Sequence, residues 1–75
     1  MSRLPILRAR EVIRALERAG FVSIRQKGSH IFLRNPVTKR TTVVPIHERE
    51  DIDRDFLAEI LTDAGIGQEE FRKLI

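Results

Sequence analysis

The chain has 75 residues, enough for one small domain with a single hydrophobic core, and we expect one domain over residues 1–75. Its hydrophobic fraction of 41% argues against wholesale disorder. The absence of cysteine excludes a disulfide scaffold, a thiol nucleophile and a cysteine-ligated metal site. No apolar run approaches the length of a membrane span or a signal-peptide core, so we expect a cytoplasmic protein that makes no membrane contact.

The net charge of +3 conceals a strong asymmetry along the chain. Residues 1–47 contain ten Lys and Arg against two acidic residues, a balance of +8. Residues 48–75 contain four Lys and Arg against nine acidic residues, a balance of −5. A basic front half is typical of a protein that binds an anionic partner such as nucleic acid, while the acidic tail argues against a uniformly basic coat.

The first regular element that we expect is a helix. Residues 1–8 contain Pro5 and no clear period, which indicates a loose lead-in. From Ala9 to Ala19 apolar residues recur at helical spacing, and Gly20 supplies a stop signal. The expected apolar stripe consists of Val12, Ile13, Leu16 and Ala19.

Three strands should follow this helix. Residues 21–27 and 30–34 are rich in aromatic and β-branched residues, and Gly28 with Ser29 forms a short turn signal between them. Residues 35–39 read as a second turn, and residues 40–46 as a third strand in which Pro45 marks an edge or an end. Consecutive strands with short links predict an antiparallel meander.

The last third of the chain predicts two more helices. Asp53 or Asp55 can cap the first of them, and Gly65 closes it. Its expected apolar stripe consists of Phe56, Leu57, Ile60, Leu61 and Ala64. Residues 68–74 predict a short third helix with apolar contacts at Phe71 and Leu74. Because each helix has one apolar stripe, we expect an α+β two-layer sandwich, with the helices on one face of a three-stranded antiparallel sheet.

His30 is the first candidate for catalysis. It follows the expected Gly28-Ser29 turn, and the phosphate-binding side chains Arg25, Lys27 and Arg34 stand near it in the sequence. Cleavage of RNA needs a base for the ribose 2′-hydroxyl or an acid for the leaving 5′-oxygen, and cations for the phosphate. Imidazole suits either proton role near neutral pH. The expected RNA-binding residues are Arg25, Lys27, Gly28, Ser29 and Arg34. The alternative is that His30 is an ordinary surface residue of a strand.

His47 is a second candidate for proton transfer. If residues 35–39 close a tight hairpin, His30 pairs near residues 44–46, and His47 then lies within a step or two of it. Two histidines could divide the acid and base work; alternatively, His47 simply ends the strand. Two histidines without an obvious third ligand fall short of a metal site, so we expect neither a metal nor a cofactor.

The other polar and aromatic residues are better explained by structural roles than by catalysis or metal binding. A solvated helix N-terminus explains the acidic run better than a metal cluster does. The run consists of Glu48, Glu50, Asp51, Asp53 and Asp55. Ser29 lacks the Gly-x-Ser-x-Gly elbow of an acyl-transfer nucleophile, so a hydrogen bond to phosphate or within the turn suits it better. Phe21 and Phe32 could stack on bases, although a chain with four aromatic residues needs most of them for its core.

Four segments occur in a characteristic order: Ala15-Leu16-Glu17-Arg18-Ala19-Gly20-Phe21, Arg25-Gln26-Lys27-Gly28-Ser29-His30, Val44-Pro45-Ile46-His47, and Ile60-Leu61 followed by Ala64-Gly65-Ile66. Together they resemble the HicA (YcfA-like) toxins of bacterial type II toxin–antitoxin systems, and the resemblance runs from about Val12 to Leu74. The resemblance implies a fold like the double-stranded RNA-binding domain and a ribosome-independent mRNA interferase whose essential residue is His30. It also implies a HicB-like antitoxin that binds the toxin and covers this histidine.

One departure from the family and two rival functions remain at this point. Members commonly carry Gly-Thr-Leu at the start of the second helix, where this chain has Asp55-Phe56-Leu57. A non-catalytic RNA-binding module is the first rival, because the implied fold binds RNA duplexes through shape and phosphates. A chain that acts mainly as half of a complex with its antitoxin, through the acidic C-terminal helices, is the second.

Overall fold

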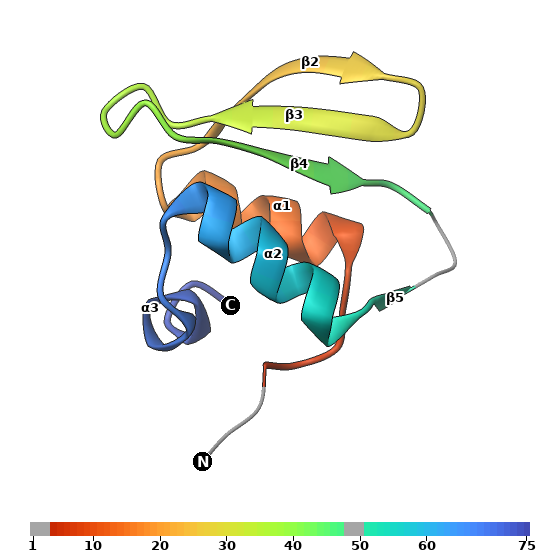
Figure 1. The fold of residues 1–75 in the computed structure, drawn as a ribbon, viewed down its shortest axis with the longest axis vertical. Helices are drawn as coiled ribbons and strands as arrows, with labels where there is room; N and C mark the ends of the chain where they lie inside the picture. Colours follow the sequence, from red (N-terminus) through yellow and green to blue (C-terminus); the bar gives the residue numbers. More distant parts are fainter. Residues whose placement is uncertain (1–3, 48–50) are drawn as a thin grey trace.

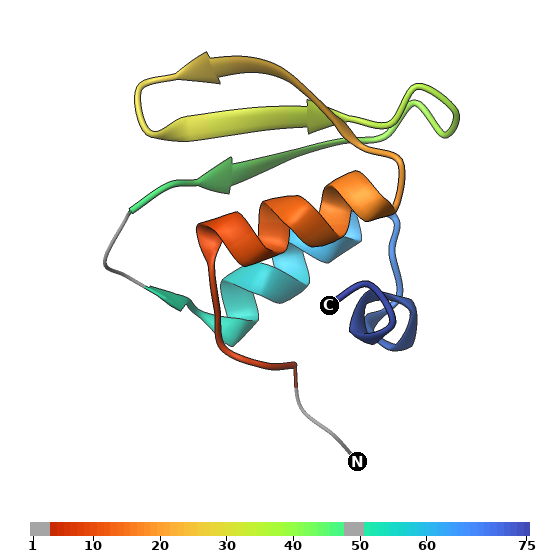
Figure 2. The same cartoon turned by 180° about the vertical axis from the view of Figure 1, so that it is seen from behind.

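The computed structural model describes residues 4–47 and 51–75, which form two layers (Figure 1). One layer is an antiparallel sheet of β2 (Val22–Lys27), β3 (His30–Arg34) and β4 (Thr41–Pro45), in the order β2-β3-β4. Helices α1 (Ala9–Arg18) and α2 (Arg54–Ala64) form the other layer. Figure 2 shows from behind that no described element covers the opposite face of the sheet. The expected α+β two-layer sandwich, with its helices on one face, is confirmed.

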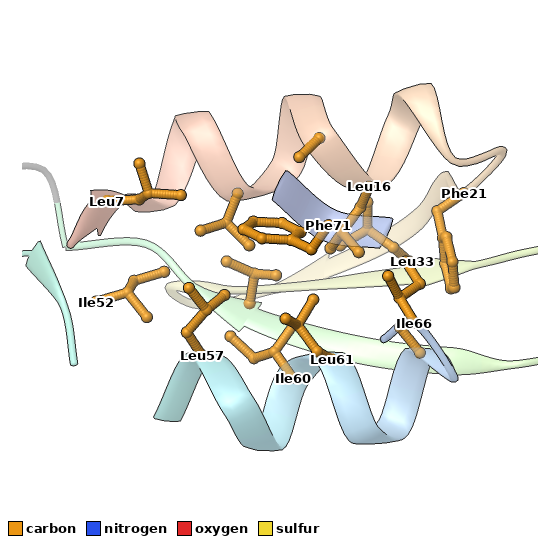
Figure 3. Close-up of a cluster of buried hydrophobic side chains, with 14 of the residues drawn as sticks. Leu7, Leu16, Phe21, Leu33, Ile52, Leu57, Ile60, Leu61, Ile66 and Phe71 are labelled. Atoms are coloured by element: carbon orange, nitrogen blue, oxygen red, sulfur yellow. The ribbon is translucent and has the colours of Figure 1, made fainter. Parts of the chain in front are cut away.

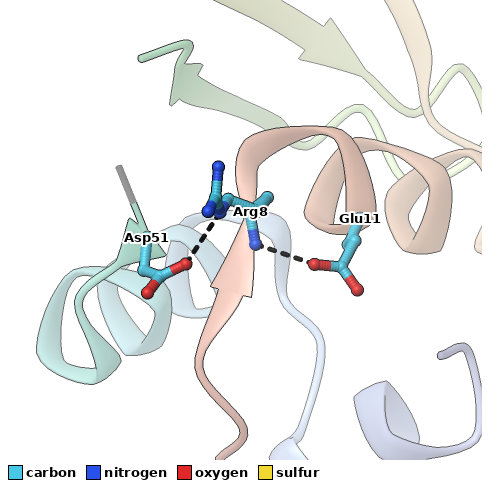
Figure 4. Close-up of polar contacts among 3 residues, drawn as sticks. All are labelled: Arg8, Glu11 and Asp51. Atoms are coloured by element: carbon cyan, nitrogen blue, oxygen red, sulfur yellow. Dashed lines mark hydrogen bonds and ion pairs between the residues drawn. The ribbon is translucent and has the colours of Figure 1, made fainter. Parts of the chain in front are cut away.

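The start of α1 is fixed by Arg8, the residue just before the helix. Its backbone N–H donates a hydrogen bond to the side chain of Glu11 at 3.0 Å, which satisfies a donor at the helix entry (Figure 4). The Arg8 side chain reaches in another direction, and its Nε lies 3.0 Å from Oδ1 of Asp51. Arg8 therefore ties the helix start to a segment 43 residues further along the chain.

The predicted loose lead-in is wrong for residues 4–8. β1 (Leu7–Arg8) pairs with β5 (Asp51–Ile52) in a separate two-stranded antiparallel sheet, with Leu7 opposite Ile52. Leu4 and Leu7 are buried in the core. Long-range pairing and burial hold this segment in place, so its order does not show as a periodic pattern in its own sequence. Residues 1–3 of the predicted lead-in lie outside the described residues.

The hydrophobic core lies between the sheet, α1 and α2, and Figure 3 shows Phe71 between the two helices. Phe71 belongs to α3 (Gln68–Arg72) and is fully buried, and Leu74, just beyond this helix, packs against the core. Phe56 differs from the prediction, because its side chain is 39% exposed. The buried stripe of α2 begins one residue later, at Leu57, and continues at helical spacing. It consists of Leu57, Ile60, Leu61 and Ala64.

Asn35 is a buried polar residue that joins the β3–β4 turn to the end of α1. Its Nδ2 donates to the carbonyl oxygen of Ala19 at 3.2 Å. Its Oδ1 accepts from the backbone N–H groups of Val37 and Thr38 at 2.9 Å and 3.2 Å. The predicted turn at residues 35–39 is thus organised by one amide side chain that is 6% exposed.

Replacing Asn35 with Ala is expected to lower the free energy of unfolding by about 2 kcal/mol, because buried backbone groups lose their partners. Urea denaturation followed by circular dichroism measures this loss. Val37→Ala in the same turn is the matched control, since Val37 is 87% exposed, and should change stability by less than about 0.5 kcal/mol. Equal stabilities of the two variants would show that the Asn35 network contributes nothing.

Candidate functional site

His30 is the first residue of β3, and the sheet register fixes its neighbours. It lies directly opposite Lys27 on β2 and Pro45 on β4. The expectation that His30 pairs near residues 44–46 is therefore confirmed. Both of these paired residues lie at the end of the sheet where β2 turns into β3 (Figure 1).

The turn before His30 is held from both sides. Gly28 has a positive φ of 59°, a conformation that glycine adopts without a Cβ penalty. Nε2 of Gln26 donates to the Gly28 carbonyl at 3.1 Å, and the Ile46 N–H donates to the Ser29 carbonyl at 2.6 Å. Because the turn is anchored to its own strand and to the end of β4, the backbone position of His30 is well defined.

Alternation along β3 places His30 on the uncovered face of the sheet. Leu33 is fully buried on the helix side, and Ile31 packs against the core from the same strand. Since successive side chains of a strand point to opposite faces, His30, Phe32 and Arg34 project from the other face. His30 and Arg34 are accordingly exposed, and Phe32 is half-buried.

The predicted cations of β2 lie on the same face. Lys27 is directly opposite His30, and Arg25 is directly opposite Phe32. Residues that face each other across an antiparallel pair share one face of the sheet. The structure therefore brings Arg25, Lys27 and Arg34 onto the surface that carries His30. We call this surface, formed by Arg25, Lys27, His30, Phe32 and Arg34, the outer face.

The charge of the outer face has one sign. The strands β2, β3 and β4 contain no Asp or Glu. In the sequence no acidic residue occurs between Glu17 and Glu48, whereas this interval contains six Lys and Arg. An array of cations without intervening carboxylates attracts a polyanion and holds phosphate groups.

His30 and His47 border one cavity of about 310 Å³. The cavity lies at the end of the sheet, next to β5 and the first turn of α2. Its lining consists of His30, Pro45, His47, Asp51, Ile52, Asp53 and Phe56. The two imidazoles thus lie beside one space, and the role of His47 in proton transfer stays a prediction.

The acidic residues near the cavity have structural partners. Asp53 is the N-cap of α2, and its Oδ1 accepts from the Asp55 N–H at 2.8 Å, so the capping residue is Asp53 rather than Asp55. Asp51 forms the ion pair with Arg8. These contacts are typical of a helix entry, as predicted; Glu48 and Glu50 lie outside the described residues. Within residues 4–47 and 51–75, no three His, Cys, Asp or Glu side chains gather as a metal site would require.

The two phenylalanines considered for base stacking lie in different environments, which the sequence analysis did not distinguish. Phe21 is 3% exposed and belongs to the core, so it is not available for stacking. Phe32 instead lies on the outer face, where the guanidinium carbon of Arg25 is 5.3 Å from the centre of its ring. A period-two count from His30 would have placed Phe32 on the same face as the histidine.

A comparison with protein families bears directly on identity. The family model for the HicA toxin of bacterial toxin–antitoxin systems matches residues 9–66 of the 75-residue chain. The match starts at the first residue of α1 and includes the whole three-stranded sheet and α2. A search of curated proteins found no match. No helix within the described part of the chain is long and apolar enough to cross a membrane.

The matched segment and the α+β fold define a toxin of a bacterial toxin–antitoxin system. The chain belongs to the HicA toxin family, as its motifs predicted.

Proposed function

We propose that the chain is an mRNA interferase, a ribosome-independent and metal-independent endoribonuclease that uses His30 as a general acid or base. The observation that carries this proposal is the outer face, where an exposed histidine stands opposite a lysine in a sheet that contains no carboxylate. A solvent-accessible imidazole next to phosphate-binding cations meets the chemical needs of phosphodiester cleavage.

The reaction begins with attack of a ribose 2′-oxygen on the adjacent phosphorus. The bond from phosphorus to the 5′-oxygen breaks, which leaves a 2′,3′-cyclic phosphate and a 5′-hydroxyl. A base takes the 2′-hydroxyl proton, an acid supplies a proton to the leaving oxygen, and His30 performs one of these steps. Lys27, directly opposite His30, stabilises the negative charge that grows on the phosphoryl oxygens. His47 borders the same cavity and is the candidate for the complementary step.

The same proposal includes the partner. A HicB-like antitoxin would neutralise the enzyme in the cytoplasm, in a hetero-oligomer that covers His30. Support comes from membership of a toxin–antitoxin family and from the exposure of His30, which leaves the residue accessible to a second protein. Covering the outer face would exclude RNA because both ligands would need the same side chains.

Incubation of the purified protein with end-labelled single-stranded RNA in EDTA tests the activity. We expect discrete cleavage products, since protein side chains alone supply the proton transfers and the phosphate contacts. Addition of an equimolar amount of the antitoxin should stop their formation. Intact RNA that remains bound, with an affinity that falls steeply with salt concentration, would favour the non-catalytic RNA-binding module instead.

A further inference from the structure

Arg25 and Phe32 form a pair on the outer face, beside the catalytic candidate. The two residues lie directly opposite each other on β2 and β3, and the guanidinium carbon is 5.3 Å from the ring centre. This distance is within the range of a cation–π contact. Phe32 is half-buried and Arg25 is exposed, so the pair places an aromatic ring, with a guanidinium group over it, on an otherwise cationic face.

We propose that the Arg25–Phe32 pair is a stacking platform for one nucleobase of the RNA, next to the phosphate that is cleaved at His30. This inference rests on the proposed function, since it assigns a base-binding role within the same site. Aromatic rings and guanidinium planes are the surfaces on which proteins stack unpaired RNA bases. Arg25 thus acts on a base, whereas the sequence indicated only a phosphate contact.

The spacing along β3 suits this arrangement. Phe32 and His30 are two residues apart on one strand and share a face, which separates their Cα atoms by about 7 Å. One extended nucleotide spans such a distance. A base stacked on the Arg25–Phe32 pair therefore leaves the neighbouring phosphate near His30 and Lys27, which are opposite each other.

The other aromatic residues do not offer the same surface. Phe21 and Phe71 are buried in the core. Phe56 is 39% exposed but borders the cavity beside Asp51 and Asp53, whose carboxylates repel phosphate. Among the described residues, Phe32 is the phenylalanine that combines access, proximity to His30 and surrounding positive charge.

Charge-matched variants separate stacking from phosphate binding. All are made in a His30→Ala background, so that the RNA stays intact, and binding is measured by fluorescence anisotropy with a short single-stranded RNA. Arg25→Lys keeps the charge but loses the planar group, and we expect about tenfold weaker binding with an unchanged salt dependence. Lys27→Ala should instead lower the salt slope by about one.

Phe32 variants test the ring itself. Phe32→Leu should weaken binding about tenfold, and Phe32→Tyr, which keeps the ring, should bind like the parent. Val37→Ala in the exposed β3–β4 turn is the control and should have no effect. If Phe32→Leu fails to fold, the exposed Arg25→Lys variant decides the question alone.

An abasic RNA gives the most specific readout. Removing the base next to the cleaved phosphate should abolish the difference between the parent and Phe32→Leu, because no base remains to stack. A difference that persists for every abasic position would overturn the platform, as would full affinity of Arg25→Lys.

The outcomes separate the two proposals. RNA cleavage by the wild type together with normal binding by both platform variants would refute the platform and leave the proposed function standing. A stacking signature without any cleavage by the wild type would refute the proposed function and leave base stacking by the pair standing. A protein that neither binds nor cuts RNA would contradict both.

Discussion

Replacing His30 with alanine is expected to reduce the rate of RNA cleavage by about 10²-fold to 10⁴-fold, the usual contribution of a positioned acid or base. The side chain is exposed at the first position of β3, so its loss removes no core contact. The free energy of unfolding should change by less than about 0.5 kcal/mol. RNA affinity should persist because the cations of the outer face remain.

Single-turnover cleavage of a labelled RNA measures this loss, with circular dichroism and anisotropy as checks on folding and binding. His47→Ala is the informative companion, since both imidazoles border one cavity. A comparable loss in both variants would indicate two proton-transfer groups. A loss confined to His30→Ala would show that His47 takes no part in proton transfer. A His30→Ala protein that cleaves at the wild-type rate would refute the catalytic assignment.

Replacing Phe71 with alanine is expected to lower the free energy of unfolding by about 3–5 kcal/mol, because the side chain is fully buried between α1 and α2 (Figure 3). A core in a domain of this size supplies only about 3–5 kcal/mol in total. The variant should therefore be largely unfolded at 25 °C. Urea denaturation of the wild type and far-UV circular dichroism of the variant measure the effect.

The control is Ile75→Ala, three residues beyond α3, where the side chain is 49% exposed and the expected loss is under about 0.5 kcal/mol. The contrast matters because the family match ends at residue 66, before α3 begins. Although α3 lies outside the matched segment, it fills the core of this chain. Wild-type stability of Phe71→Ala would show that α3 is dispensable.

Local patterns predicted most of the fold. The helical period of residues 9–19 matches α1, and β3 has the expected bounds. These elements were predictable because the period of a strand or helix appears within a few neighbouring residues. The caps followed the same logic: Asp53 accepts a backbone N–H at the start of α2, and Gly65 adopts a φ of 72° at its end.

Features that depend on distant parts of the chain were not predictable. The pairing of β1 with β5 joins segments that are separated by most of the fold, and neither two-residue strand has a period of its own. The exposure of Phe56 has the same kind of cause, since the sheet and the other helices decide which stripe of α2 is buried.

In the candidate site, too, the features set by neighbouring residues were predictable and those set by the assembled sheet were not. The hairpin around Gly28 and the cations near His30 were evident from the sequence. The pairing of Arg25 with Phe32 follows from the same hairpin, because Lys27 lies opposite His30 and the register runs without a shift from there to Arg25. The shift further along, between Ser23 and Arg25, was not evident. Such a bulge changes which residues share a face, and only the assembled sheet reveals it.

The chemical ends of the RNA products test the central claim most directly. After incubation of the wild-type protein with a defined RNA in EDTA, the 5′ fragment should carry a 2′,3′-cyclic phosphate and the 3′ fragment a 5′-hydroxyl. A single 2′-deoxy substitution at the cleaved nucleotide should then block cutting at that bond. Fragments with 3′-hydroxyl and 5′-phosphate ends, or undiminished cleavage of the deoxy-substituted RNA, would contradict an attack by the 2′-oxygen with His30 as proton-transfer group.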